Sequence, residues 1–234
     1  MHILRSFRQS KSSGSGDGTR RECARREEGS TDGQTFDYLN LTLCVPPQVQ
    51  PIYSMSACSA RRSSPRCGRV LNMGTGCGVN GMLPARGGAD VVALDINPEA
   101  IRAARDDARR NGVDNRFEVR LSDVFDAVDP TADGPFDVMV FDPPFRWFLP
   151  RALLEMATAD PGYRALTRFM REARLHLSDR GRLLVFFGSS GDLGYLQRLV
   201  AAEGFETEVL SHKARVDAGW QVEYITYRLR PRKA

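Results

Sequence analysis

Neither a paired-cysteine motif nor a long apolar run occurs in this chain of 234 residues. The cysteines include no C-x-x-C pair, and their odd number argues against a closed set of disulfides. The chain does not open with a basic stretch followed by an apolar one, and no apolar run approaches the ~20 residues that a membrane span needs. These absences predict a protein of the reducing cytoplasm with no membrane segment and no metal site. The five cysteines are Cys23, Cys44, Cys58, Cys67 and Cys77.

A strong charge imbalance is also missing from most of the chain. The formal net charge is +4, but residues 70–234 carry 22 basic and 23 acidic side chains. Residues 1–69 carry 11 basic and 6 acidic side chains, so the basic excess belongs to the N-terminal part. A nucleic-acid partner is therefore permitted but is not indicated by charge.

Large apolar side chains are scarce between Phe7 and residue 36. A stretch so poor in apolar surface cannot offset the entropy of ordering, so residues 1–36 are predicted to be a disordered basic and polar tail. Residues 37–68 begin with alternating apolar and polar side chains and then turn small, polar and basic. They predict a short strand or hairpin followed by a loop. Residues 69–234 are expected to form the folded domain.

From residue 69 onward, β-rich runs alternate with helical stretches. Strands separated by helices favour right-handed crossovers and a parallel sheet. The last two strands have no helix between them, which predicts an antiparallel hairpin at one edge. The fold class is therefore α/β and doubly wound, a mainly parallel seven-stranded sheet with an antiparallel C-terminal edge hairpin. The predicted strands are 70–73, 91–96, 117–121, 136–142, 182–187, 205–211 and 220–230, and the predicted helices are 79–87, 98–111, 150–156, 163–177 and 192–203.

A glycine-rich turn, NMGTGCG over 72–78, directly follows the first strand of this series. Glycines let the backbone pass close to a ligand, and the next helix offers unpaired N–H groups at its start. Asp95 follows Gly78 by 17 residues and ends the second strand. In a doubly wound sheet the two positions meet at the carboxyl edge, where an acid can accept both hydroxyls of a ribose. Because residues 76–81 also fit G-x-G-x-x-G, an NAD(P)-dependent oxidoreductase is an alternative.

Two features favour a different cofactor. The predicted edge hairpin is unlike the all-parallel sixth strand of a nicotinamide-binding sheet. In addition, the strand over 136–142 runs directly into Asp142-Pro143-Pro144-Phe145. With these residues, the stretch from about 69 to 211 resembles class I S-adenosylmethionine-dependent methyltransferases. It is most similar to the small-domain group related to release-factor glutamine and guanine-N2 ribosomal RNA methyltransferases.

The resemblance implies S-adenosyl-L-methionine as the cofactor and assigns residues to its site. Where the family usually has an acid before the first glycine, this chain has Asn72, which weakens the expected contact to the methionine ammonium. Asn97, the predicted N-cap of the second helix, follows Asp95 closely and is assigned to the same site. Asp123 matches the acid that contacts adenine. The predicted cofactor-binding residues are Asn72, Gly74, Gly76, Gly78, Asp95, Asn97 and Asp123.

The [D/N]-P-P-[F/Y/W] motif of the family implies methylation of a nitrogen and marks four catalytic residues, Asp142, Pro143, Pro144 and Phe145. A carboxylate at Asp142 and the Pro143 carbonyl can accept N–H bonds, and Phe145 offers a face for a planar group. Asp at the first motif position favours an amino group over protein glutamine. The methyl acceptor is left open among a small molecule, a protein side chain and RNA. A non-catalytic module that only binds the cofactor is a third alternative.

Overall fold

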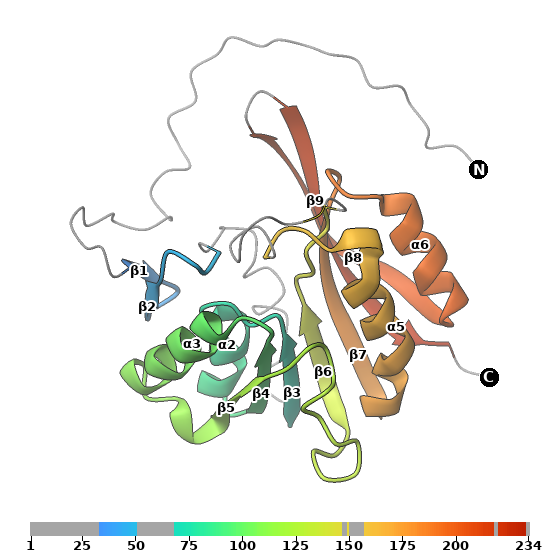
Figure 1. The fold of residues 1–234 in the computed structure, drawn as a ribbon. Helices are drawn as coiled ribbons and strands as arrows, with labels where there is room; N and C mark the ends of the chain where they lie inside the picture. The colour runs from blue at the N-terminus through green and yellow to red at the C-terminus, as the bar shows by residue number, and fades with distance from the viewer. Residues whose placement is uncertain (1–32, 51–67, 147–148, 150–156, 218–219, 233–234) are drawn as a thin grey trace.

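The computed structural model describes most of the chain from residue 33 onward (Figure 1). The predicted helix over 150–156 and the greater part of the predicted tail lie outside the described residues. The description covers residues 33–50, 68–146, 149, 157–217 and 220–232.

The core of the domain is a seven-stranded sheet with the order β5-β4-β3-β6-β7-β9-β8. The first five strands in this order are parallel, whereas β9 is antiparallel to β7 and β8 is antiparallel to β9. The predicted fold class is thus confirmed, including the edge hairpin. The strands are β3 (Arg69–Met73), β4 (Asp90–Asp95), β5 (Phe117–Leu121), β6 (Phe136–Phe141), β7 (Leu177–Gly188), β8 (Phe205–Asp217) and β9 (Trp220–Pro231).

In the described part of the chain, α2 and α3 lie on one face of the sheet and α5 and α6 lie on the other (Figure 1). Neighbouring residues of one strand point to opposite faces, so Val70 joins the cluster under α2 and α3 while Leu71 joins the cluster under α5 and α6. Strand β6 is apolar on both faces from Val138 to Phe141, as a strand covered on both faces requires. The helices are α2 (Val79–Arg86), α3 (Pro98–Arg110), α5 (Arg164–His176) and α6 (Leu193–Ala202), with 3₁₀ turns at η1 (Asp114–Arg116) and η2 (Pro161–Tyr163).

A separate two-stranded hairpin, β1 (Gln34–Tyr38) and β2 (Leu41–Val45), packs against α3. A short strand or hairpin was predicted from residue 37. The structure has a hairpin that begins at Gln34, so the boundary placed after residue 36 lies inside β1. The backbone N–H of Cys44 donates to both carboxylate oxygens of Asp107 on α3, at 3.0 and 2.9 Å. Leu41 and Leu43 are buried in the same apolar cluster as α3. Polar and apolar contacts therefore both hold this hairpin on the domain.

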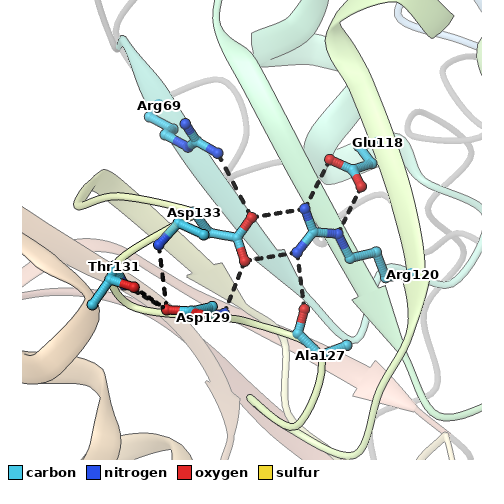
Figure 2. A network of polar contacts seen from close by, with 8 residues as sticks. Arg69, Glu118, Arg120, Ala127, Asp129, Thr131 and Asp133 are labelled. Carbon is cyan, nitrogen blue, oxygen red and sulfur yellow. Dashed lines mark hydrogen bonds and ion pairs between the residues drawn. The ribbon is translucent and has the colours of Figure 1, made fainter.

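The connection from β5 to β6 contains no helix and is held by polar contacts instead (Figure 2). The Arg120 guanidinium donates to both carboxylate oxygens of Asp133, each at 2.7 Å, and to the Ala127 carbonyl at 2.9 Å. It also donates to both oxygens of Glu118, at 2.7 and 2.9 Å. A bidentate arginine–carboxylate pair fixes orientation as well as distance, so Arg120 anchors the connection to β5.

Strand β7 is longer than predicted, because it begins at Leu177 rather than residue 182. Its polar start is held by the Ser178 hydroxyl, which donates to Asp137 at 2.9 Å. A side chain at Gly181 would come within 2.9 Å of the Phe136 carbonyl, so only glycine fits at this position of the strand.

Within the described residues, every helix is too short or too polar to span a membrane.

Candidate active site

The strand order places a crevice between β3 and β6. From β3 the chain winds outward to β4 and β5, then crosses back to β6 on the other side of β3. At such a switch point the loops beyond the carboxyl ends diverge, and ligands bind there in open α/β sheets. Met73 pairs with Phe141 in the β3–β6 register. Gly74 and Asp142, the next residues of the two strands, therefore leave the sheet side by side.

A cavity of about 760 Å³ opens at this edge of the sheet. Residues at the ends of β3, β4, β5 and β6 line it, and residues of β8 and β9 complete its wall. The β8–β9 hairpin protrudes beyond the rest of the sheet (Figure 1). Nine of the eleven predicted site residues line it, which are Gly74, Gly76, Asp95, Asn97, Asp123, Asp142, Pro143, Pro144 and Phe145. The two others, Asn72 and Gly78, lie behind the wall.

The glycine-rich turn passes close under the cavity. Gly74 and Gly76 adopt positive φ angles of 64° and 55°, which glycine reaches without strain. A Cβ at position 76 would meet nothing within 4 Å, so the backbone there faces open space. The N–H of Gly76 donates to Asp95 at 2.8 Å, which joins the turn to the end of β4.

Asp95 is held by backbone donors on both carboxylate oxygens. One oxygen accepts from Gly76, and the other accepts from the N–H of Asn97 at 2.9 Å. Burial raises the pKa of Asp95 above its ordinary value, and the N–H bonds from Asn97 and Gly76 lower it in part. The N–H of Ile96 also faces this carboxylate and lowers its pKa in part.

The Asn97 side chain acts in the local structure. It accepts from the N–H of Glu99 at 2.9 Å, as an N-cap does, and donates to the Gln48 carbonyl at 3.0 Å. Its role as N-cap of α3 is confirmed. Its assignment to the cofactor stays a prediction, supported by its place on the cavity wall.

Asn72 and Gly78 support the turn from below. Asn72 is 1% exposed, and its Oδ1 accepts from the Thr75 hydroxyl at 2.8 Å. Gly78 has φ 91°, and a Cβ there would lie 3.3 Å from the Phe117 ring on β5. Gly78 therefore lets α2 begin close to the sheet. Burial raises the pKa of the neighbouring Cys77 thiol to about 12, which keeps it protonated and unreactive at neutral pH.

Asp123 follows β5 on the far side of the cavity. Its carboxylate lies 3.4 Å from Arg164, and its backbone carbonyl accepts from Arg168 at 3.0 Å. Both arginines come from α5, so the end of β5 is joined to the helix that packs beside β6. Arg164 also lines the cavity, and the sequence carried no motif that marked it.

Contacts from distant segments place the Asp142–Phe145 motif. The Tyr163 hydroxyl donates to the Phe145 carbonyl at 3.0 Å and accepts from the N–H of Asp192 at 2.7 Å. The centroids of the Phe145 and Phe187 rings lie 5.6 Å apart. A Cβ at Gly191 would come within 2.4 Å of the Phe145 carbonyl, so this close packing needs glycine.

Several cavity residues were not predicted from the sequence. Asp160 is buried, and its carboxylate oxygens accept from the N–H groups of Ala165 and Leu166 at 3.1 and 3.0 Å. Arg215 and Tyr224 reach the cavity from the edge hairpin. Only the fold brings these positions to the site. Two features of the sequence could have indicated them. Arg215 and Tyr224 belong to the edge hairpin, and Asp160 directly precedes the PGY turn at 161–163.

Comparisons with known proteins agree with this geometry. Residues 60–212 match the methyltransferase small domain. A release factor glutamine methyltransferase from Agrobacterium fabrum is 32% identical over 172 residues, which cover 68% of this chain and 57% of that protein. The ribosomal RNA small subunit methyltransferase C of Haemophilus influenzae is 32% identical over 124 residues, which cover 52% of this chain and 33% of that protein. The chain thus spans less than two thirds of the length of these relatives.

Solved structures share the fold at low sequence identity. The tRNA m1G37 methyltransferase of M. jannaschii superposes with a TM-score of 0.63 at 17% identity, covering 88% of this chain and 59% of that one. A ribosomal protein L11 methylase from Lactobacillus delbrueckii subsp. bulgaricus gives a TM-score of 0.57 at 18% identity, covering 81% and 84%. The antiparallel β9 also differs from the all-parallel edge that the oxidoreductase alternative required. Together with the match over 60–212, these features show that the chain belongs to the methyltransferase small domain family.

Proposed function

We propose that this protein is an S-adenosylmethionine-dependent methyltransferase that methylates a nitrogen atom. The observation that carries the proposal is the β3–β6 register. It sets the glycine-rich turn and the Asp142–Phe145 motif next to each other at the mouth of one cavity. A cofactor on the first and an acceptor on the second would meet there.

The residues at the turn fit such a cofactor. Open space above Gly76 allows close approach to the backbone. The Asp95 carboxylate, already oriented by backbone N–H groups, would accept from the ribose hydroxyls. Asp123 and the end of β5 would border the adenine. Asp95 therefore both closes the turn and would hold the sugar.

When bound, the cofactor supplies an electrophilic methyl group on its sulfonium. An amino or amide nitrogen conjugated with a carbonyl or ring is a weak nucleophile, so the protein must orient it closely. Asp142 and the Pro143 carbonyl would accept its N–H bonds, which favours a pyramidal nitrogen. Pro144 contributes no competing N–H, because proline has none. Phe145 would stack on the planar acceptor.

The proposal specifies the methyl acceptor only as a compound with a nitrogen atom that can be methylated. Relatives named above act on a release-factor glutamine or on ribosomal RNA. Asp at the first motif position favours an amino group over an amide. Transfer of a tritiated methyl group to RNA, protein and metabolite fractions would identify the acceptor class.

Cofactor binding tests the proposal first. A ligand present at ~100 times its dissociation constant raises the stability of the folded state by about 2.7 kcal/mol. We expect S-adenosylmethionine and S-adenosylhomocysteine to raise the melting temperature and NADH to leave it unchanged. Stabilisation by NADH alone would favour the oxidoreductase alternative. Binding of adenosylmethionine without methyl transfer to any fraction would favour a non-catalytic module.

A further inference from the structure

The tip of the β8–β9 hairpin extends past the end of β7, at the edge of the sheet where the cavity opens (Figure 1). The last residues that pair β7 with β9 are Gly188 and Tyr224. Beyond this pair, the described residues of β8 and β9 are bonded as strands only to each other. Arg215 and Tyr224 line the cavity. The hairpin tip therefore supplies a wall of the site that the parallel strands do not reach.

The face of this tip that borders the cavity is basic. Residues opposite each other on two strands share a face, and the faces alternate along each strand. Lys213 lies opposite Tyr224, and Arg215 is two residues farther along β8, so all three side chains share one face. Within residues 211–216 and 221–226, this face holds the two cations and no acid.

Neither cation is neutralised by the protein. Glu223 lies on the opposite face, where its carboxylate is 3.0 Å from Nε2 of His212. Lys213 and Arg215 are exposed, and neither forms an ion pair or a side-chain hydrogen bond with another described residue. Two neighbouring positive charges repel each other, and an anion bound beside them would turn this repulsion into attraction.

An aromatic surface connects the basic face with the proposed acceptor motif. A Cβ at Gly188 would lie 3.0 Å from the Phe145 ring and 3.4 Å from the Tyr224 ring, so the two rings meet over this glycine. Tyr224 also stacks on Phe186, with 5.6 Å between centroids and 9° between planes. All three rings line the cavity. A flat group on Phe145 would thus have Tyr224 beside it and Lys213 on the next strand outward.

A planar ring that carries an anion at one end is the chemical pattern of a nucleotide. Aromatic side chains stack on bases, and cations beside them hold the phosphates. The Arg215 guanidinium can donate two parallel bonds to a phosphate, and the Lys213 ammonium adds a point charge. The exocyclic amino group of a base also has the N–H donors that Asp142 and the Pro143 carbonyl would accept.

We propose that Lys213 and Arg215 form a phosphate-binding subsite, and that the methyl acceptor is the base of a nucleotide, free or within an RNA strand. This inference rests on the proposed function. It needs only a local pair of cations, so it agrees with the nearly balanced charge of residues 70–234. The subsite positions the acceptor, whereas Asp142 would act at its nitrogen.

The first experiment varies the phosphate and keeps the base. RNA from cells that lack this protein is tested intact, digested to nucleoside monophosphates, and dephosphorylated to nucleosides. A small-metabolite extract of the same cells is tested with and without phosphatase treatment. Transfer of a tritiated methyl group should be about tenfold or more lower without phosphate. Label in the RNA strand or in the untreated metabolite extract tells which source supplies the phosphate.

The second experiment removes the cations singly. In Arg215→Gln and in Lys213→Gln, the KM for the labelled acceptor should rise about tenfold. The kcat and the affinity for S-adenosylhomocysteine should stay within about twofold, because the lost contact serves acceptor binding alone. Arg215→Lys keeps the charge but loses the bidentate geometry, so its KM should fall between.

Arg180→Gln is the matched control. Arg180 is exposed and also has no ion pair or side-chain hydrogen bond with another described residue. It lies near the start of β7, at the opposite end of the sheet from the cavity. We expect this variant to keep the wild-type KM. All four variants should keep the wild-type melting temperature, because each changes an exposed side chain that contributes no bond.

The outcomes separate the two claims. Nucleosides labelled as well as their phosphorylated forms, or label confined to protein, would overturn the phosphate subsite and leave the proposed methyltransferase in place. An unchanged KM in Arg215→Gln and Lys213→Gln would overturn it as well. So would an equal rise of KM in Arg180→Gln, because overall charge would then explain the effect. A protein that binds neither adenosylmethionine nor adenosylhomocysteine would overturn the proposed function, and this inference with it.

Discussion

The two sides of the cavity are built differently. On the side proposed to bind the cofactor, β3, β4 and the turn between β3 and α2 supply the groups, and backbone N–H groups alone orient Asp95. On the side proposed to bind the acceptor, the Asp142–Phe145 motif is placed by a side chain, that of Tyr163, and by the loop at Gly191 and Asp192. Tyr163 and Asp192 hold the Phe145 carbonyl through one hydroxyl, and Gly191 makes room for it.

The groups that orient Asp95 and the groups that place Phe145 share no residue. Either set can therefore be altered without changing the other. Substitutions on the two sides should therefore affect different measurements.

The largest effect is expected on the acceptor side. Asp142→Ala should lower turnover by about 10²–10³, the usual scale for losing one oriented polar group at the reacting centre. Affinity for adenosylmethionine should stay within a few-fold, because Asp142 is proposed to contact the acceptor nitrogen. Asp142→Asn keeps one acceptor oxygen and should lose less. Steady-state kinetics with the identified acceptor, together with calorimetry, would check both. Unchanged turnover in Asp142→Ala would remove this residue from the mechanism.

On the cofactor side, Asp95→Ala should weaken adenosylmethionine binding by about 10- to 100-fold, since the ribose hydroxyls lose a charged acceptor. The turn also loses its bond from Gly76, so the melting temperature without ligand should fall. Asp95→Asn keeps one acceptor and should fall between. Titration calorimetry gives the affinities. A variant that binds the cofactor normally would place the ribose elsewhere.

Tyr163→Phe probes the positioning of the motif. Loss of the hydroxyl leaves the Phe145 carbonyl and the Asp192 N–H without their partner, which should lower the free energy of unfolding by about 1–3 kcal/mol. The KM for the acceptor should rise while cofactor affinity stays unchanged. Tyr195→Phe is the control, because that hydroxyl bonds Thr167 and does not contact Phe145. If both variants change KM alike, general loosening of α5 and α6 is the better explanation.

Asp107, which holds the β1–β2 hairpin on α3, should make the free energy of unfolding depend on pH. Burial raises the pKa of Asp107 to about 6, despite N–H donation from Cys44 and the nearby Arg110. Between about pH 4 and 6 the folded state then binds more protons than the unfolded state, so this group's contribution to stability falls as pH rises. Asp107→Asn should remove that part of the slope in urea unfolding. An unchanged slope in Asp107→Asn would contradict this prediction.

The smallest effect is expected from the N-terminal stretch. Deleting residues 1–32 should leave the melting temperature and cofactor affinity nearly unchanged, because their composition predicts few native contacts. Deleting residues 1–45 should lower the melting temperature strongly, since it removes Leu41 and Leu43 from the core. A large loss from the shorter deletion would contradict the predicted tail.

The sequence predicted the order of strands and helices well, because buried strands and amphipathic helices carry different periods. Boundaries failed where polar residues form a strand. The start of β7 at Leu177 looks like a turn in sequence, yet Ser178 is bonded to Asp137 in the neighbouring strand. The hairpin start at Gln34 was missed for the same reason, because β1 is mostly exposed.

The candidate site was predicted where a motif is contiguous. Gly76, Asp95 and Asp142 were found because their positions after strands have a direct geometric meaning. Asp160 was not singled out, since an acid before a Pro-Gly turn is ordinary until its burial is known. The role of Tyr163 was not predicted, because its bond to Phe145 depends on packing between segments.

The β3–β6 register also determines where the chain tolerates a change of length. A single residue inserted within β6 would advance its end by about 3.3 Å and turn every following side chain to the opposite face. Asp142 would then no longer leave the sheet beside Gly74. The β5–β6 connection lies before that register, and Arg120 anchors it near Ala127 and Asp133 (Figure 2). Extra residues there, between Asp129 and Asp133, would lengthen a loop without moving Asp142 away from Gly74.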